Sequence, residues 1–449
     1  MTENRKNLAK ITVIASLSSL VIVLLSNFVN IPFYYLILLI LFFLVLFKKI
    51  EYGIYLMAFF LPVINWNFSY SFMNIPFIDL LSLGVFIIYF LQVFLVRGFN
   101  KIKFPHYLSF FSFFAVVILS SLFSDNIFSS LWYSFRWILF FYLVYIVLPF
   151  NVIKNEKILK NTLLAFVLST LAISLMGLIS VFSQDWVSSL ARVRPLSIFG
   201  IFLVGENQNL MVETMLPGIF ILIALKYWYR DRQIKKIINL LIIFVSFILI
   251  LTFSRGAWLS LFLLSIFYAV VYFRKNIVSF LMPMFLVFIV LLPVIFYMIN
   301  LQTTYSVGIS SNQSRILLSE IALDAFERHP ILGQGTGTYF NMVAENIRFR
   351  ANYYDPVDSH GVLQKVLSEN GLLGIITLSI FVLAIFKKYF SILKERKYID
   401  LYLAMIASAS TLFIFELFNT SYYKGKIWFV VALSLVTISL IREEKIYEK

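Results

Sequence analysis

Residues 358–386 read DSHGVLQKVLSENGLLGIITLSIFVLAIF, and this stretch places a single histidine, His360, where a long polar segment enters an apolar helix. The apolar part approaches the roughly 20 residues that an α-helix needs to cross a bilayer. Ionisable groups near the bilayer are costly and tend to be retained for function. Because the chain has only 3 histidines, the sequence singles out His360 as a candidate base.

The rest of the chain repeats the apolar half of this pattern. Hydrophobic residues make up 61% of the chain and charged residues 13%, whereas a soluble domain carries about 25% charged residues. We therefore predict an all-α, polytopic membrane helix bundle in which residues 1–449 form a single integral membrane domain. About 14 transmembrane helices are expected. They are placed at residues 11–30, 32–47, 52–64, 76–96, 107–123, 131–150, 161–182, 208–228, 237–253, 256–273, 277–299, 361–386, 401–419 and 427–441.

The net charge of +15 is distributed in short clusters of lysine and arginine. In a soluble protein such a charge would suggest a nucleic-acid partner. Here successive clusters are separated by two apolar spans each, which is the pattern of basic cytoplasmic loops. We therefore predict cytoplasmic termini, a surrounding of membrane lipids and no nucleic-acid partner. The absence of cysteine excludes disulfides, thiol catalysis and thiolate metal sites.

In this topology the outward loops are short except for residues 183–207 and 300–360. The second loop, inserted between two transmembrane helices, is expected to be partly helical. It contains a predicted amphipathic helix over Ser314–Arg328, which Asn312 or Ser314 would cap. A proline and three glycines follow and would end this helix. Its apolar face is expected to comprise Ile316, Leu317, Ile321, Ala325 and either Leu323 or Phe326.

The cations of the outward segments are all of one kind. In the two long loops and at the junction around Arg255, every cationic side chain other than histidine is an arginine, whereas lysine is used in the cytoplasmic loops. The planar fork of arginine binds phosphate oxygens in pairs, while lysine is a hydrated point charge. The sequence therefore predicts an outward site for a phosphate or pyrophosphate, formed by Arg192, Arg194, Arg255 and Arg315.

Each of these arginines also has an ordinary interpretation. Arg255 lies between two apolar runs and could reach from a helix end to the membrane interface. Arg192 and Arg194 could be solvated loop residues. Arg315 could pair with Glu320 on the surface of the amphipathic helix.

His360 could simply cap the helix that follows it by bonding a loop carbonyl. Its neighbours indicate more, because one helical stripe runs from it through Leu363, Gln364, Leu367, Gly371 and Gly374. Glycines on such a stripe allow another helix to approach closely. Glu369 lies off the stripe, and we interpret it as a structural contact between helices.

Four segments appear in a characteristic order. They are Arg192-Val193-Arg194 leading to Gly205-Glu206-Asn207-Gln208-Asn209, then Ser254-Arg255-Gly256-Ala257, then Ser314-Arg315 with His329-Pro330-Ile331-Leu332-Gly333-Gln334-Gly335, and finally His360 with Gly371 and Gly374. In order, spacing and outward topology they resemble the O-antigen ligase and O-antigen polymerase superfamily. The sequence departs from that family at Gly361, since the family usually has a polar residue directly after the histidine.

The resemblance implies a metal-independent, inverting glycosyltransferase of the bacterial cytoplasmic (inner) membrane, with its active site on the outer face. The donor would be a glycan on undecaprenyl diphosphate, moved en bloc to an acceptor sugar hydroxyl, and no cofactor is expected. A ligase would use a lipid A core sugar or a protein as acceptor, whereas a polymerase would use a lipid-linked repeat. A chain-length regulator or a flippase is a possible partner.

The residues suit this chemistry, which needs a base for the acceptor hydroxyl and positive charge for the leaving diphosphate. We assign His360 as general base or acceptor orienter. Arg255 and Arg315 would clamp the diphosphate, with Arg192 or Arg194 assisting. The alternative is a transporter or flippase of lipid-linked or small-molecule substrates, since a bundle of this size also suits that class. A purely structural membrane scaffold is the remaining alternative.

Overall fold

The computed structural model describes residues 43–443 except 71–72, 99–100, 184–191, 199, most of 273–310, 354, 394 and 396. The first predicted span lies outside these residues, as do most of the second and most of the eleventh, 277–299. The helices are α3 (Glu51–Phe60), α4 (Phe77–Gln92), η1 (Val93–Arg97), α5 (Tyr107–Leu122), α6 (Ile127–Tyr133), η3 (Ser134–Leu139), η4 (Phe141–Val147), α7 (Leu148–Val152), α8 (Glu156–Phe182), α9 (Gln208–Leu225), η5 (Lys226–Trp228), α10 (Arg232–Ile250), α11 (Arg255–Tyr272), α13 (Ser311–Arg328), α14 (Tyr339–Glu345), α15 (Ile347–Tyr353), α16 (Val362–Phe390), α17 (Ile399–Glu416) and α18 (Gly425–Arg442).

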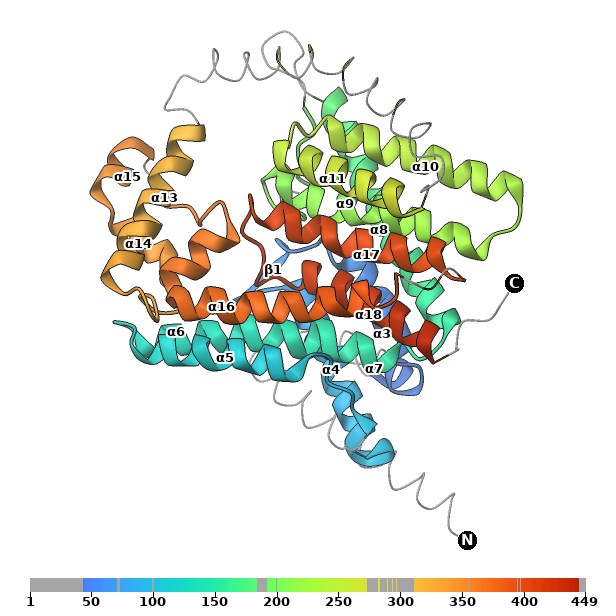
Figure 1. Cartoon of the computed structure of the whole chain (residues 1–449), viewed down its shortest axis with the longest axis horizontal. Helices are drawn as coiled ribbons and strands as arrows, with labels where there is room; N and C mark the ends of the chain where they lie inside the picture. The colour runs from blue at the N-terminus through green and yellow to red at the C-terminus, as the bar shows by residue number, and fades with distance from the viewer. Residues whose placement is uncertain are drawn as a thin grey trace.

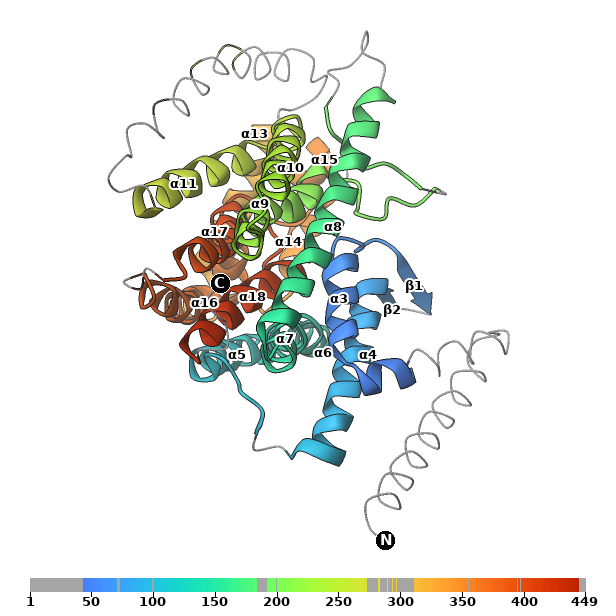
Figure 2. The same cartoon turned by 90° about the vertical axis from the view of Figure 1, so that its right-hand side faces the viewer.

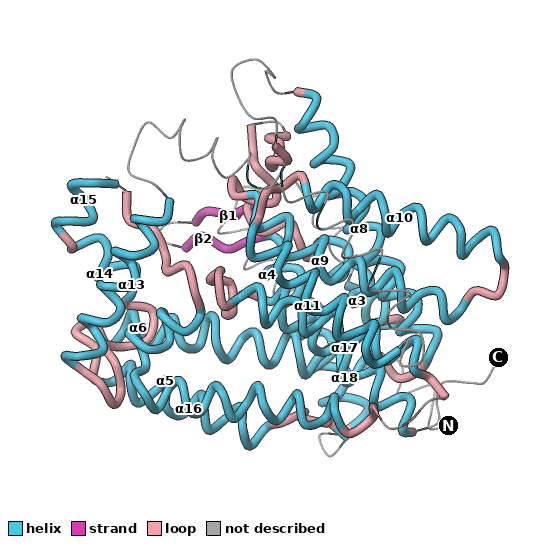
Figure 3. The backbone as a smooth tube through the Cα atoms, turned by 45° about the horizontal axis from the view of Figure 1, so that its top comes forward, coloured by secondary structure: helices cyan, strands magenta, loops and turns pink. Residues whose placement is uncertain are grey.

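The chain is an all-α membrane bundle, as predicted. Among the described residues, 9 helices are long and apolar enough to span a membrane, and α5 is a shorter apolar helix. The predicted third span is α3, a helix of 10 residues, so the total of 14 spans stays a prediction. A single two-stranded sheet is named within the described residues, the antiparallel hairpin of β1 (Asn67–Tyr70) and β2 (Met73–Pro76), drawn in magenta in Figure 3.

The centre of the bundle is formed by α9, α17 and α18. Almost every residue of these three helices is buried, and α17 packs against both α9 and α18. By contrast α10 and α11 bury only a narrow strip of their apolar surface, as helices facing lipid do. Figure 2, which looks along several of the helices, shows α10 and α11 at the edge, with α8 between α9 and α3.

The long helix α16 is interrupted near its first third. Gly371 has φ 61° and ψ −159°, which no L side chain adopts without strain. The loop that follows α13 packs into this break, where the backbone N–H of Leu372 donates to Pro330 O at 2.9 Å and that of Gln334 donates to Ser368 O at 2.9 Å. The sequence interpretation of Gly371 as part of a smooth helical stripe was therefore wrong, since what approaches here is a loop and not a second helix.

At one end of the bundle, α13, α14 and α15 form a small cap beside the start of α16, on the left of Figure 1. The predicted amphipathic helix is confirmed as α13, which ends at Arg328 as expected. Ser314 lies inside α13, which begins at Ser311, so Ser314 is not the N-cap residue of this helix. The face was partly misassigned, since Ile316 and Leu323 are 60% and 50% exposed. The buried face consists of Leu317, Leu318, Ile321, Ala322 and Ala325, and most of it packs on Tyr339, Val343 and Phe349.

The two ends of the bundle have different contacts. We call one end the arginine end, because it holds Arg255, Arg315 and His360. Here the loops that are predicted to face outward bond to one another. Examples are the bonds Asn65 N–H to Leu203 O, Ser254 Oγ to Asn209 Oδ1 and the Ser359–Thr420 hydroxyl pair. The opposite lysine end joins the basic loops, as in Lys103 N–H to Asn151 Oδ1, Lys103 to Glu443 and Arg442 to Ser391. This segregation matches the predicted alternation of loops.

Candidate active site

His360 is half-buried in the extended segment that leads into α16. The preceding Ser359 is anchored on both sides, since its hydroxyl donates to Gly361 O at 3.1 Å and lies 2.9 Å from the hydroxyl of Thr420. A Cβ on Gly361 would lie 2.9 Å from Leu417 O. The departure from the family pattern at Gly361 thus has a physical reason, because the loop after α17 passes too close for a side chain.

Arg315 is held near His360 by the packing of α13 on α16. The side-chain amide of Gln364 donates to Ser319 Oγ at 2.6 Å, and Ser319 is one helical turn after Arg315. Gln364 lies in the first turn of α16, directly after the segment that carries His360, so this bond brings the Arg315 helix to the start of α16. Glu320, the partner that would have made Arg315 an ordinary surface charge, pairs with Arg348 at 2.9 Å.

The electrostatics connect three of the predicted residues. Burial and the Arg315 guanidinium lower the pKa of His360, while Asp358 opposes this shift. Burial and Arg255 in turn lower the pKa of Arg315. The Nε of Arg315 is buried and has no hydrogen-bond partner among the described residues. Arg315 therefore acts on the imidazole of His360 and Arg255 acts on Arg315, so the three groups are close enough to interact electrostatically.

Arg255 is exposed on the first turn of α11. The chain reverses just before it, where Phe253 has a φ of 54°, unusual for a bulky residue. The turn is fixed by Ser254 Oγ, which donates to Asn209 Oδ1 at 2.9 Å. The position of Arg255 therefore depends on α9, which holds Asn209, as well as on α11.

Arg192 and Arg194 flank a buried residue, Val193, whose N–H donates to Leu251 O at 2.9 Å. This bond places them beside the turn that carries Arg255. Burial and the neighbouring Arg194 lower the pKa of Arg192. The structure thus brings Arg255, Arg315 and His360 together. Arg192 and Arg194 lie beside the α10–α11 turn, to which Val193 bonds.

A buried ion cluster supports the His360 segment. Lys365 Nζ lies 2.8 Å from Asp358 Oδ1 and 3.1 Å from Glu369 Oε1, and the side chain of Lys365 is 2% exposed. Glu369 also accepts the N–H of Tyr339 at 3.1 Å. It is therefore a buried contact between α16 and the cap, in keeping with the structural role expected for it.

Sequence reasoning missed the loop between α17 and α18. Tyr423 donates to Asp358 Oδ2 at 3.1 Å, and Ser421 donates to Glu213 Oε1 at 2.6 Å. Lys426 completes this connection with a 3.0 Å ion pair to Glu213. The available signal was the polar run from Asn419 to Lys424 between two apolar spans.

A cavity of about 440 Å³ lies behind this loop at the arginine end, a size within the roughly 300–1,000 Å³ of small-molecule sites. Trp137 and Asp79 line it, together with residues of the Gly205–Asn207 segment. The Trp137 ring is 5.4 Å from the ring of Tyr423, which bonds Asp358 near the candidate base. One aromatic wall thus separates the cavity from the His360 segment.

Within the described parts of the chain, no group of three or more histidine, cysteine, aspartate or glutamate side chains is placed to hold a metal ion. The comparison with protein families matches residues 240–379 to the family described as O-antigen ligase. No curated protein matches the chain. The matched range, which is less than half of the chain, contains Arg255, Arg315 and His360, so this part of the chain is similar to the O-antigen ligase superfamily that its motifs resembled.

Proposed function

We propose that this protein moves a glycan en bloc from undecaprenyl diphosphate to an acceptor sugar hydroxyl, as an O-antigen ligase or polymerase. The observation that carries the proposal is the half-buried imidazole of His360, whose pKa is lowered by burial and by Arg315. A neutral histidine accepts a proton near pH 7. The family match to O-antigen ligase supports the same class of membrane glycosyltransferase.

In the proposed step the acceptor oxygen bonds to the anomeric carbon while the bond from that carbon to the diphosphate oxygen breaks. The acceptor proton passes to His360, and undecaprenyl diphosphate leaves with the electron pair, which inverts the anomeric centre. Arg315 and Arg255 stabilise the charge that develops on the diphosphate. Arg192 and Arg194 widen this positive surface. Neither a metal nor a cofactor takes part.

The transporter alternative is less well supported by where the buried charges lie. Transporters hold such groups near the middle of the bilayer. Here Asp79, Glu213, Lys365 and Lys426 lie in the first two turns of their helices, Glu369 lies one turn after Lys365, and Glu416 is the last residue of α17. All six therefore lie toward the arginine end, where a reaction between membrane-anchored glycans would take place.

The test is a reconstituted reaction. Purified protein in vesicles receives undecaprenyl-diphosphate-linked glycan with either a lipid A core acceptor or a second lipid-linked repeat. We expect glycan transfer in step with release of undecaprenyl diphosphate, unchanged by a metal chelator. The productive acceptor distinguishes ligase from polymerase. Movement of intact donor between leaflets without bond cleavage would identify a flippase instead.

The outer-face assignment is tested separately by labelling. Asn352 in α15 and Lys236 in α10 are both exposed, and the chain has no cysteine of its own. In whole cells an impermeant thiol reagent is expected to label Asn352→Cys and to spare Lys236→Cys. Labelling of Lys236→Cys from outside would place the arginine end in the cytoplasm and would contradict the proposed donor site.

A further inference from the structure

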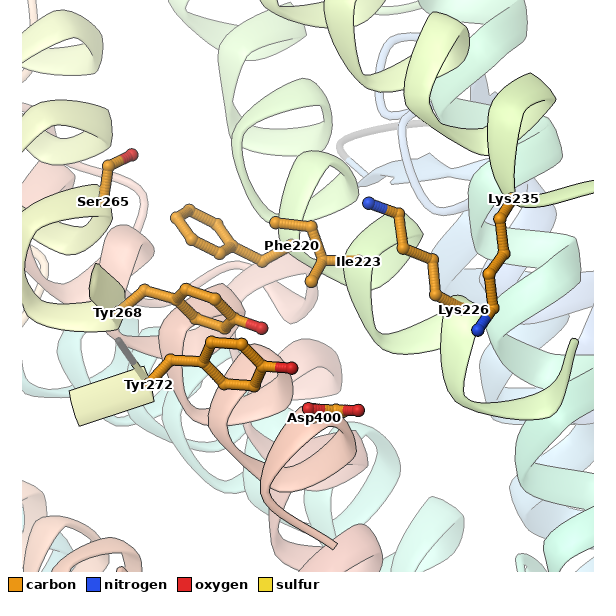
Figure 4. A pocket seen from close by; sticks show the side chains of 8 residues that line it. All are labelled: Phe220, Ile223, Lys226, Lys235, Ser265, Tyr268, Tyr272 and Asp400. Carbon is orange, nitrogen blue, oxygen red and sulfur yellow. The ribbon is translucent and has the colours of Figure 1, made fainter. Parts of the chain in front are cut away.

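A second pocket lies at the lysine end, between α9, α10, α11 and α17, and has a volume of about 360 Å³ (Figure 4). This pocket and the proposed active site lie at opposite ends of α11. Arg255 begins α11, whereas the pocket is lined by Tyr268 and Tyr272 at the other end of that helix. The α11 segment between them is about 20 Å long at 1.5 Å per residue. The glycan chemistry therefore leaves this pocket without a role.

The pocket wall changes from apolar to basic along α9. Phe220 and Ile223 form its apolar part, and Lys226 follows immediately after the helix, where η5 begins. Lys235 faces the same pocket from the first turn of α10. In Figure 4 the Phe220 ring lies beside the Tyr268 ring, Lys226 and Lys235 lie on the other side of the view, and Asp400 lies between the tyrosines and the lysines.

The tyrosines form the opposite wall. The rings of Tyr268 and Tyr272 are stacked, with centroids 5.4 Å apart and planes 18° apart, and their hydroxyls point the same way in Figure 4. The Tyr272 hydroxyl bonds Asp400 at the start of α17, the single carboxylate lining the pocket, and this bond orients the carboxylate toward the tyrosines without removing its negative charge. Tyrosines of this kind mark the level of lipid headgroups in membrane proteins.

The two lysines have no carboxylate within ion-pair distance among the described residues. Both lysines line the same pocket, with Lys226 half-buried and Lys235 exposed. Two ammonium groups in one pocket give it a positive potential, which attracts an anion. The pocket's apolar wall and its two lysines together point to an amphiphilic anionic ligand.

We propose that this pocket binds the headgroup of an anionic phospholipid from the leaflet that faces the basic loops. The phosphate lies between Lys226 and Lys235, and an acyl chain follows Phe220 and Ile223 toward the membrane interior. Access is from the side, because α10 and α11 form the exposed edge of the bundle. Basic pockets between transmembrane helices on the cytoplasmic side have this preference. The bound lipid braces four helices whose far ends carry the proposed active site.

The test measures lipid binding to purified full-length protein by native mass spectrometry, with dioleoyl phosphatidylglycerol and dioleoyl phosphatidylcholine as probes. We expect the wild type to prefer phosphatidylglycerol. The double variant Lys226→Gln/Lys235→Gln is expected to bind it about 30-fold more weakly, equivalent to about 2 kcal/mol at 1.4 kcal/mol per tenfold. Lys226→Arg/Lys235→Arg keeps both charges and is expected to retain binding.

The matched control is Lys157→Gln/Lys236→Gln, which removes two exposed lysines of the basic loops outside the pocket. It is expected to bind phosphatidylglycerol like the wild type. Equal losses in both double variants would reduce the effect to general surface charge and overturn the proposal. Inorganic phosphate tests whether the ligand is a lipid or a free anion. Binding of inorganic phosphate as tight as that of phosphatidylglycerol would also overturn the proposal. Neither readout depends on glycan transfer.

Discussion

The arginine end and the lysine end of the same bundle use charge in opposite ways. At the arginine end Lys365 is 2% exposed and contacts two carboxylates. At the lysine end Lys103 meets Glu443 at 2.7 Å with 61% of its side chain exposed. An exposed pair of that kind contributes about 0–1 kcal/mol, whereas breaking a buried pair costs roughly 3–5 kcal/mol. The Lys103 pair is therefore largely solvated, whereas the Lys365 cluster holds the segment that carries His360.

The buried charges at the arginine end also connect the segment that carries His360 to its neighbours. Lys365 connects the loop before α16 to the helix itself, since Asp358 precedes His360 and Glu369 follows it. Asp358 accepts a further bond from Tyr423 of the α17–α18 loop. Each partner is needed because a buried charge without one is expensive. The segment that carries His360 is consequently held both by α16, which follows it, and by the α17–α18 loop, whose Tyr423 lies 65 positions from Asp358.

The largest effect is expected for His360→Ala, which tests whether the arginine end carries the reaction. Loss of one general base is expected to reduce glycan transfer by about 10²–10⁴-fold, or roughly 3–5 kcal/mol of barrier. Donor binding should persist, because the proposed diphosphate ligands are arginines. The measurements are turnover and donor affinity of the reconstituted enzyme.

A matched control is His329→Gln, which changes an exposed histidine at the same end. It is expected to leave turnover unchanged. Near wild-type turnover of His360→Ala would remove this residue from catalysis. Loss of donor binding in that variant would instead assign it to the diphosphate site.

The second test replaces each arginine of the proposed clamp by lysine, the cation of the other end. Arg315→Lys keeps the charge but loses the two-pronged geometry, and a charge-assisted hydrogen bond contributes about 1.5–3 kcal/mol. We expect turnover to fall by about one to two orders of magnitude. We expect a larger effect than for Arg255→Lys, because Arg315 is on a helix packed against α16 while Arg255 is exposed.

The comparison of the two arginines has a clear contrary outcome. Rates for both variants are measured with saturating donor in vesicles, together with the fraction of protein that inserts and remains monodisperse. Full activity in both would mean that the two-pronged geometry of these arginines takes no part in the reaction. The arginine end would then differ from the lysine end in burial alone.

A third test concerns the break in α16. In Gly371→Ala the new Cβ would lie 2.5 Å from Ile331 O at a φ of 61°, so the docked loop must shift. Backbone strain of this kind costs about 1–3 kcal/mol. We expect a lower thermal midpoint and reduced transfer. Gly84→Ala is the control, since its Cβ would meet only Phe43 at 3.9 Å within a helix, and equal destabilisation of both variants would contradict the docking role.

The smallest expected effect is a shift in pH dependence. His360 accepts a proton only when neutral, so activity falls as pH drops through its pKa. Burial and Arg315 lower that pKa, and Asp358 raises it. Arg315→Gln is therefore expected to move the acidic limb of kcat/KM to higher pH, and Asp358→Asn to lower pH. Limbs that coincide with the wild type in both variants would show that another group titrates.

Much of the fold was accessible from sequence because membrane insertion is a local property. The spans at 161–182 and 208–228 are confirmed as α8 and as α9 with η5, within a few residues. The apolar length and flanking charges that define such a span are contiguous in the chain. The amphipathic helix α13 was found for the same reason, although its buried face was shifted toward Leu318 and Ala322.

The candidate residues were found by chemical type, while their arrangement was not. A lone histidine and an arginine-only set of outward loops are visible without coordinates. That Arg315, rather than Arg192, acts on His360 depends on how α13 packs on α16. The sequence also left Glu320 open as a partner of Arg315. In the tertiary structure Glu320 pairs with Arg348 instead.

By itself the sequence determined the membrane class, the positions of most helices and the residues that carry the proposed chemistry. Tertiary structure alone decided that Gly371 breaks α16 to receive the Pro330–Gly337 loop, and that Thr420 lies against Ser359. These contacts join residues 61 positions apart for Thr420 and Ser359, and 249 positions apart where Ser120 donates to Glu369 O. Periodicity and local charge report what a segment buries, but the partner that satisfies a buried polar group comes from whichever distant segment packs there.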